Sequence, residues 1–312
     1  MSREYVWRPP WPVHVHVVLG SLQRGSGDPA YRREADGTVW RTCRTPEGPA
    51  TLRLRTRTSD GEVLATAWGA GSEWVLARVP DLLGAADDLA GFEPRHERVT
   101  AAWHRHPHWR QGRTSLVVDA LVPAIVEQLV TGAEASRGWR LLLHRFGERA
   151  PGPAGEAGMR VTPTPAQWAA VPSWEWLRAG VDGKRSGAVV RAVRSAGRLE
   201  QTVGQPSASV DRALQSLSGV GVWTSAEVRQ RAHGDTDAVS FGDYHVAKDV
   251  GWALTGSPVD DDGLAELLEP YRPHRYRVQR LLELDGAWRP RRGPRMSVRT
   301  HLPVSRSLRP AP

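Results

Sequence analysis

The feature that most constrains this 312-residue chain is a five-residue segment, Leu217-Ser218-Gly219-Val220-Gly221, between two stretches of helical periodicity. Two glycines one residue apart let the backbone turn sharply and keep side chains off the outer surface of the turn. Backbone N–H groups at the start of the second helix can then face a phosphate. An ordinary helix–helix turn, with one glycine ending the first helix, explains the same residues.

A second feature is the pair Gly242-Asp243, which follows the glycine turn after a short apolar run. Asp243 directly precedes residues 244–255, whose apolar spacing predicts a helix. Aspartate is a favoured N-cap, so local structure alone can account for it. A carboxylate at a helix start can also line a cleft, and the two roles are compatible.

The periodicity divides the chain into a strand-rich and a helical part. Residues 1 to about 70 contain β-branched runs between turn signals, at 13–22, 38–44, 50–57 and 62–68, and a helix is predicted at 72–87. From about Arg95 onward the spacing is helical. We predict an α+β fold with a small strand-rich N-terminal α/β domain (1–95), an all-helical domain (96–289) and an Arg- and Pro-rich disordered tail (290–312).

Positive charge is concentrated near the C-terminus. The chain carries a formal net charge of +8, and residues 271–312 contain many arginines but only two acidic residues, Glu283 and Asp285. Such a segment favours a polyanionic partner, because neutralising phosphates releases counterions. A solvated tail without a partner explains the same composition.

Cysteine content and hydropathy limit the class of protein. The single cysteine, Cys43, excludes an internal disulfide, a cysteine-rich zinc site and an iron–sulfur cluster. It also fits a reducing compartment, so we expect a cytoplasmic, nucleoid-associated protein. No apolar run is long enough to span a bilayer, and we expect no membrane partner.

Taken together, the residues from Leu214 to Trp252 resemble the helix-hairpin-helix DNA glycosylase superfamily. The glycine turn, then Trp223-Thr224, then Gly242-Asp243 carry the resemblance, and the chain is most similar to the 3-methyladenine DNA glycosylase II (alkylbase) family. The resemblance extends from about residue 10 to residue 288. Ser218 is a departure, because the family usually has proline there.

The resemblance implies that Asp243 is the catalytic carboxylate. Breaking an N-glycosidic bond builds positive charge on the sugar, which a nearby carboxylate stabilises while it directs the attacking water. Bifunctional relatives use a lysine just after the hairpin as an amine nucleophile, and this chain has Trp223 there. We therefore expect hydrolysis without a lyase step.

The same resemblance assigns a base pocket to Trp223, Glu227, Tyr244 and His274. An aromatic face at Trp223 can stack on a flipped base, although a buried tryptophan packing the hairpin is the alternative. Glu227 replaces a tyrosine found in some relatives and would favour cationic bases, or it is a solvated helix residue. His274 departs from the aromatic residue of the family and leaves the breadth of the pocket open.

DNA contacts are implied for five residues: Gly219, Gly221, Thr224, Gln128 and Leu129. The backbone N–H groups of the two glycines would meet phosphate. Leu129 matches the apolar wedge that fills the gap left by a flipped base, although a leucine on a helix is more often core. Gln128 would contact the opposite strand or cap the helix.

No cofactor is expected to be required. The backbone carbonyls of Gln215, Leu217 and Val220 match positions that hold a monovalent cation (Na⁺ or K⁺) in relatives. We expect a monomeric DNA glycosylase that removes alkylated, 3-methyladenine-like purines from damaged double-stranded DNA in base excision repair. Two alternatives stay open: a non-catalytic helix-hairpin-helix DNA-binding protein, and a glycosylase for deaminated or other damaged bases.

Overall fold

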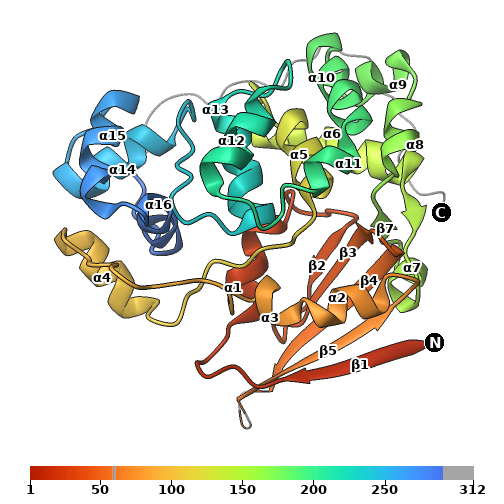
Figure 1. The fold of residues 1–312 in the computed structure, drawn as a ribbon, viewed down its shortest axis with the longest axis horizontal. Coiled ribbons are helices and arrows are strands. Elements are labelled where there is room, and N and C mark those ends of the chain that lie inside the picture. The colour runs from red at the N-terminus through yellow and green to blue at the C-terminus, as the bar shows by residue number, and fades with distance from the viewer. Residues whose placement is uncertain (58, 60, 291–312) are drawn as a thin grey trace.

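A five-stranded antiparallel sheet with short helices forms the N-terminal part of the protein, and the rest is mostly helical (Figure 1). The computed structural model describes residues 1–57, 59 and 61–290. The strand order is β1-β5-β4-β3-β2. The strands are β1 (Ser2–Trp7), β2 (Tyr31–Arg33), β3 (Val39–Thr45), β4 (Gly48–Arg57) and β5 (Glu62–Trp68).

The three central strands follow the predicted runs closely. In β5, Val63, Ala65 and Ala67 are buried while the residues between them are partly exposed, as expected for a strand with one face on the core. These residues pack with two helices, α1 (Val15–Leu19) and α2 (Ser72–Ala77), in one apolar cluster. The edge strands β1 and β2 were not predicted, because their mostly polar sequences show no alternation and only the sheet holds them.

The strand predicted at 13–22 is wrong. The segment forms α1 (Val15–Leu19) and a 3₁₀ turn, η1 (Gly20–Leu22). Val15 and Leu19 lie four residues apart, on one face of the helix, and both side chains are buried in the core of the sheet. Burial of this face therefore overrides the strand propensity of the valines. The helix predicted at 72–87 is shorter and divides into α2 (Ser72–Ala77) and α3 (Val79–Leu82), where Pro80 begins the second helix.

Three apolar clusters of described residues lie within the helical part. The largest has members on α5, on α6 and on each helix from α8 through α13. A smaller one joins α4 to α14, α15 and α16, and a third, of Ala102, Trp109 and Leu281, joins α4 to α16. The helices are α4 (Glu97–Arg105), α5 (Val117–Val126), α6 (Gly132–Phe146), α7 (Pro153–Glu156), α8 (Pro165–Ala169), α9 (Ser173–Arg178), α10 (Gly183–Arg194), α11 (Ala196–Glu200), α12 (Ser207–Gln215), α13 (Val222–Val228), α14 (Val246–Thr255), α15 (Asp261–Leu268) and α16 (Arg275–Leu284). Shorter elements are a π-helical turn η2 (Arg229–His233), a 3₁₀ turn η3 (Glu269–Tyr271) and the strand pair β6 (Glu148–Arg149) and β7 (Arg160–Val161).

Several long-range contacts attach the sheet to the helices. Arg44 on β3 donates to the carbonyl of Thr162 at 2.8 Å, and Thr51 on β4 donates to the carbonyl of Pro151 at 2.8 Å. Leu116, just before α5, belongs to the core of the sheet. The proposed domain boundary at residue 95 stays a prediction, and the tail lies, except for Pro290, outside the described residues.

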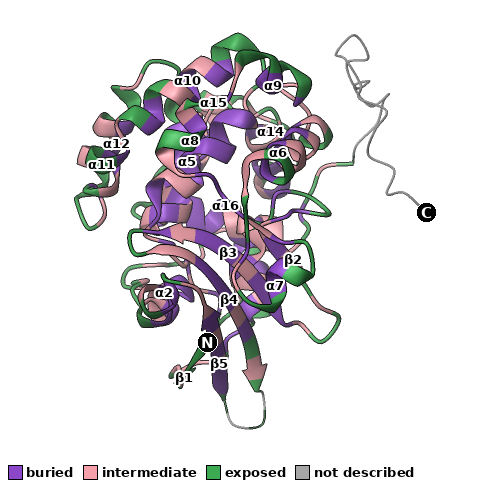
Figure 2. Cartoon of the chain, turned by 90° about the vertical axis from the view of Figure 1, so that its right-hand side faces the viewer, coloured by how far each residue is buried: buried purple, intermediate pink, exposed green. Residues whose placement is uncertain are grey.

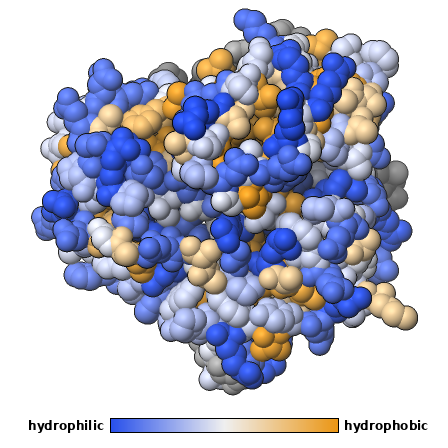
Figure 3. Space-filling view, viewed as in Figure 1, coloured by the Kyte–Doolittle hydropathy of each residue, from blue (hydrophilic) through white to orange (hydrophobic). Residues whose placement is uncertain are grey.

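Buried residues concentrate on the central strands and on the inner sides of the helices (Figure 2). The face in Figure 3 is mostly hydrophilic, with hydrophobic residues in small separate groups. Within the described ranges, every helix is too short or too polar to cross a membrane.

A stack of three tryptophans supports the larger helical cluster. Trp168 lies between Trp139 and Trp176, with ring centroids 6.3 and 5.6 Å away. Its side chain is only 1% exposed, so Trp168→Ala would leave a large cavity. We expect this variant to lower the free energy of unfolding by about 3–5 kcal/mol in chemical denaturation.

Trp174 on α9 provides the matched control, because its side chain is 64% exposed. Trp174→Ala should change the free energy of unfolding by no more than about 0.5 kcal/mol. Equal losses for the two variants would contradict the assignment of Trp168 to the core.

Candidate active site and nucleic-acid interface

The predicted glycine turn joins α12 to α13, and its two glycines serve different ends. Gly219 has φ +96°, and a Cβ there would lie 2.7 Å from the Cβ of Ala188 on α10. The fold itself therefore requires glycine at this position. Gly221 has φ −99°, and no atom lies within 4 Å of the place where its Cβ would be. Nothing in the described protein explains the second glycine, which leaves the outer surface of the turn open.

Two side chains from outside the hairpin hold it in place. Gln128 Nε2 donates to the carbonyl oxygen of Gly219 at 2.9 Å and to Thr224 Oγ1 at 2.7 Å. Arg191 on α10 donates through Nε and a terminal nitrogen to the carbonyl of Ser218, at 3.2 and 3.1 Å. Gln128 thus connects the end of α5 to the hairpin. No sequence pattern points to Arg191, because its partner is a backbone oxygen 27 residues away.

Leu129 lies in a strained, exposed loop beside the hairpin. The helix α5 ends at Val126, and α6 begins at Gly132 after Thr131, which forms a capping box with Glu134. Between these helices Leu129 adopts φ +54°, and its side chain is 96% exposed. A leucine in this conformation is uncommon. Leu129 is therefore not a core residue of a helix, and its exposure is what a wedge requires.

Three hydrogen bonds fix the carboxylate of Asp243. Oδ1 accepts the backbone N–H groups of His245 at 2.7 Å and Val246 at 3.1 Å, at the start of α14. Oδ2 accepts the indole N–H of Trp223 at 3.2 Å. The helix predicted over 244–255 begins at Val246 with His245 as its N-cap, so Asp243 is not the N-cap itself, but its carboxylate bonds the N–H groups at the helix start. The same carboxylate also contacts the helix that follows the glycine turn. The carboxylate remains partly exposed to solvent.

Aromatic side chains flank this carboxylate. Tyr244 is 72% exposed, and Lys248 Nζ lies 3.9 Å from the centroid of its ring. The ring also contacts His245 edge-on, with centroids 4.9 Å apart. The buried Nδ1 of His245 has no hydrogen-bond partner among the residues that the structure describes. The residue after Asp243 therefore has an exposed aromatic ring, whereas the imidazole nitrogen of His245 is buried.

Glu227 is buried in an ion pair rather than solvated. Its Oε2 accepts a guanidinium N–H of Arg231 at 2.6 Å, and its Oε1 accepts the hydroxyl of Ser240 at 2.9 Å. The alternative of a solvated helix residue is therefore wrong. A role in a base pocket stays a prediction, and Arg231 already compensates the carboxylate charge that would favour a cationic base.

His274 is likewise buried and bonded within the protein. It follows the cis peptide bond between Arg272 and Pro273. Its Nε2 lies 2.9 Å from the carbonyl oxygen of Ala90, and its Nδ1 accepts from Arg277 Nε at 3.3 Å. Its pocket role stays a prediction, although both ring nitrogens have partners.

The predicted cation site consists of carbonyl oxygens only. Such uncharged ligands fit a monovalent cation in kind, and the Leu217 carbonyl already accepts the N–H of Val220 at 3.0 Å. The third residue, Gln215, is exposed and donates through its side chain to Asp211. No group of three His, Cys, Asp or Glu side chains able to hold a metal occurs within the described ranges. Cation binding therefore stays a prediction.

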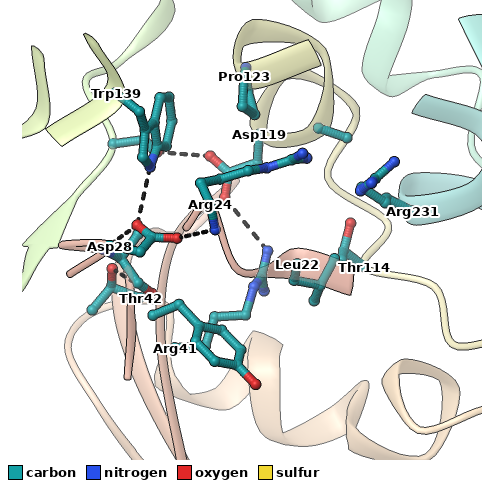
Figure 4. A pocket seen from close by; sticks show the side chains of 14 residues that line it. Leu22, Arg24, Asp28, Arg41, Thr42, Thr114, Asp119, Pro123, Trp139 and Arg231 are labelled. Atoms are coloured by element: carbon teal, nitrogen blue, oxygen red, sulfur yellow. Dashed lines mark hydrogen bonds and ion pairs between the residues drawn. The ribbon is translucent and has the colours of Figure 1, made fainter. Parts of the chain in front are cut away.

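A polar cavity of about 40 Å³ lies where the sheet meets the helices (Figure 4). Charged residues from both parts line it: Arg24, Asp28, Arg41, Asp119 and Arg231. Burial raises the pKa values of Asp28 and Asp119, partly offset by hydrogen bonds and, for Asp119, by the nearby Arg41. No sequence pattern points to this cluster, because its members are scattered from residue 24 to residue 231.

Solved structures with a similar fold are DNA glycosylases. The 3-methyladenine DNA glycosylase of Archaeoglobus fulgidus matches with a TM-score of 0.74 and 15% identity, over 90% of this chain and 98% of that one. The apo form of the Clostridium acetobutylicum 8-oxoguanine glycosylase/lyase matches with a TM-score of 0.68 and 12% identity, over 91% and 98%. No family model and no curated protein matches the sequence. The likeness shows that the chain has the fold of helix-hairpin-helix DNA glycosylases.

The two glycines of the hairpin should respond differently to alanine. Gly219→Ala places a Cβ against Ala188 at a positive φ, and we expect it to lower the free energy of unfolding by about 1–3 kcal/mol. Gly221→Ala meets no protein atom and should leave the free energy of unfolding within about 0.5 kcal/mol of wild type. Thermal and chemical denaturation measure both, and a large loss for Gly221→Ala would contradict this division.

Proposed function

We propose that this chain is a monofunctional DNA glycosylase that hydrolyses the N-glycosidic bond of alkylated, 3-methyladenine-like purines in double-stranded DNA. The observation that carries the proposal is the carboxylate of Asp243, held by Trp223 and the start of α14 beside the hairpin. A glycosylase fold with the hairpin alone would equally suit a protein that binds DNA without cutting a bond. The fixed, partly exposed carboxylate favours the enzyme.

The hairpin supplies the grip on DNA. Around Gly221 no protein atom approaches the turn, so a phosphate has room to reach its backbone. The buried hydroxyl of Thr224 accepts from Gln128, which makes it a support of the hairpin rather than a surface contact. Leu129 enters the duplex as the wedge, since it is exposed in a loop tied to the same hairpin through Gln128.

The chemistry needs little besides the carboxylate and a water. As the bond between C1′ and the base nitrogen breaks, its electron pair leaves with the base, and positive charge builds on the sugar. Asp243 stabilises that charge and orients a water whose oxygen bonds to C1′. An alkylated purine is already cationic and leaves as a neutral base, so no acid at the base is required.

Trp223 has two roles in this proposal: it stacks on the extruded base and it orients the carboxylate of Asp243. Its indole N–H fixes Asp243 and leaves the ring face for stacking on an extruded base. The exposed ring of Tyr244 adds a second aromatic surface beside the same carboxylate. Trp223 also occupies the position of the lyase lysine, and Lys184 and Lys248 are the only lysines in the chain. We therefore propose water as the nucleophile.

A second candidate is a glycosylase for oxidised bases, because one structural neighbour is an 8-oxoguanine glycosylase/lyase. Duplexes carrying 3-methyladenine, 7-methylguanine, hypoxanthine or 8-oxoguanine, analysed for free base and for strand cleavage, separate the two. Release of methylpurines with intact strands supports the first proposal. Release of 8-oxoguanine with strand cleavage supports the second.

Asp243→Asn should lower the single-turnover rate of base release by about 10²–10³-fold or more, because the amide no longer stabilises the sugar cation. Binding to damaged DNA should stay within about twofold of wild type. Asp262→Asn, an exposed carboxylate in the first turn of α15, is the control and should excise normally. An active Asp243→Asn enzyme would show that the catalytic carboxylate lies elsewhere.

Gly221→Ala should weaken DNA binding by roughly tenfold, about 1.4 kcal/mol, because the methyl group stands where a phosphate would approach. Fluorescence anisotropy with an undamaged duplex isolates this backbone contact from base recognition. Ser216→Ala, at the other end of the exposed turn, controls for general changes of the surface. Unchanged affinity for Gly221→Ala would mean that phosphate binds elsewhere.

A further inference from the structure

The loop that carries Leu129 is held at both sides by side chains from distant parts of the chain. On one side, the Gln128 amide bonds the hairpin. On the other, Arg24, from the N-terminal segment after α1 and η1, donates to both carboxylate oxygens of Glu127 at 3.0 and 2.8 Å. Leu129 comes directly after Glu127 and Gln128 in the chain, and its backbone has a positive φ.

Arg24 is itself firmly placed. Its side chain is only 8% exposed, and its backbone N–H donates to Asp28 Oδ2 at 2.7 Å. Asp28 Oδ1 in turn accepts the indole N–H of Trp139 on α6 at 3.0 Å, as Figure 4 shows. Arg231 donates to the carbonyl of Ser21 at 3.0 Å, which anchors the segment a second time. The guanidinium of Arg24 is therefore a fixed point for Glu127.

We propose that Arg24 is a positioning residue for the loop of residues 127–130, through which the N-terminal part of the protein sets the wedge Leu129 for nucleotide extrusion. The inference rests on the proposed glycosylase function. A leucine at positive φ is disfavoured, so the loop keeps this shape only while its neighbours are held. Without Arg24, the carboxylate of Glu127 loses its buried partner and moves toward water. The backbone of the loop moves with it.

The structure offers a matched control on the same helix. Arg41 on β3 pairs with Asp119 in the first turn of α5 at 3.6 Å, and both side chains are mostly buried. This pair also joins the sheet to α5, but at the end of the helix away from the loop. A purely structural role would make the two arginines equivalent.

The experiment compares Arg24→Ala, Arg24→Lys, Glu127→Gln and Arg41→Ala with the wild-type full-length protein. Extrusion is followed by the fluorescence of 2-aminopurine placed next to 3-methyladenine in a duplex, and excision by single-turnover base release. Anisotropy gives DNA affinity, and thermal denaturation gives stability. Glu127→Gln removes the charge at constant shape and serves if Arg24→Ala does not fold.

We expect Arg24→Ala and Glu127→Gln to slow extrusion and base release roughly tenfold to a hundredfold while DNA affinity changes less than about twofold. Arg24→Lys should recover most of the rate, and Arg41→Ala should extrude normally even where its thermal stability is lower. Normal extrusion by a folded Glu127→Gln, or equal losses in Arg24→Ala and Arg41→Ala, would overturn the inference alone. A wild-type protein that neither extrudes nor excises any lesion would overturn the proposed function and the inference with it.

Discussion

The arrangement of the site depends on two buried guanidinium groups, Arg24 and Arg231, which join the segment before β2 to the helices. Arg24 pairs with Glu127, and Arg231 pairs with Glu227. An uncompensated buried charge costs several kcal/mol, so each partner must stay where the other is. The first pair fixes the end of α5. The bond from Arg231 to the carbonyl of Ser21 joins the same N-terminal segment to η2, which continues α13 with Trp223. The segment before β2 thereby contacts the elements around the candidate active site.

The hydrogen bonds at the start of α14 also orient the proposed catalytic carboxylate. Asp243 accepts backbone N–H groups at that helix start with one oxygen and the indole N–H of Trp223 with the other, so the protein itself sets its orientation. A group that is already oriented needs no reorganisation as charge develops on a sugar. The two glycines of the hairpin likewise have different roles. Gly219 leaves room for Ala188 of α10, while Gly221 leaves the outer surface of the turn open.

The backbone arrangement and the side chains of the candidate pocket answer different questions about this protein. A TM-score of 0.74 at 15% identity shows that one backbone arrangement persists under very different side chains. Choice of lesion depends on side chains, and here two of the four pocket candidates, Glu227 and His274, are engaged in bonds within the protein. Trp223 and Tyr244 remain as the aromatic surfaces next to Asp243. Selectivity by stacking suits electron-poor, cationic purines.

Features that depend on near neighbours could be predicted from the sequence. Local spacing and turn residues indicate the strands β3, β4 and β5, the helices on either side of the glycine turn, and the place of Asp243 beside a helix start. The packed structure was needed to show that residues 15–22 are helical, that Leu129 is exposed at positive φ, and that Arg24 holds Glu127. These outcomes depend on contacts between residues far apart in the chain. No local pattern records such contacts, because burial and charge pairing are settled only when the two parts pack together.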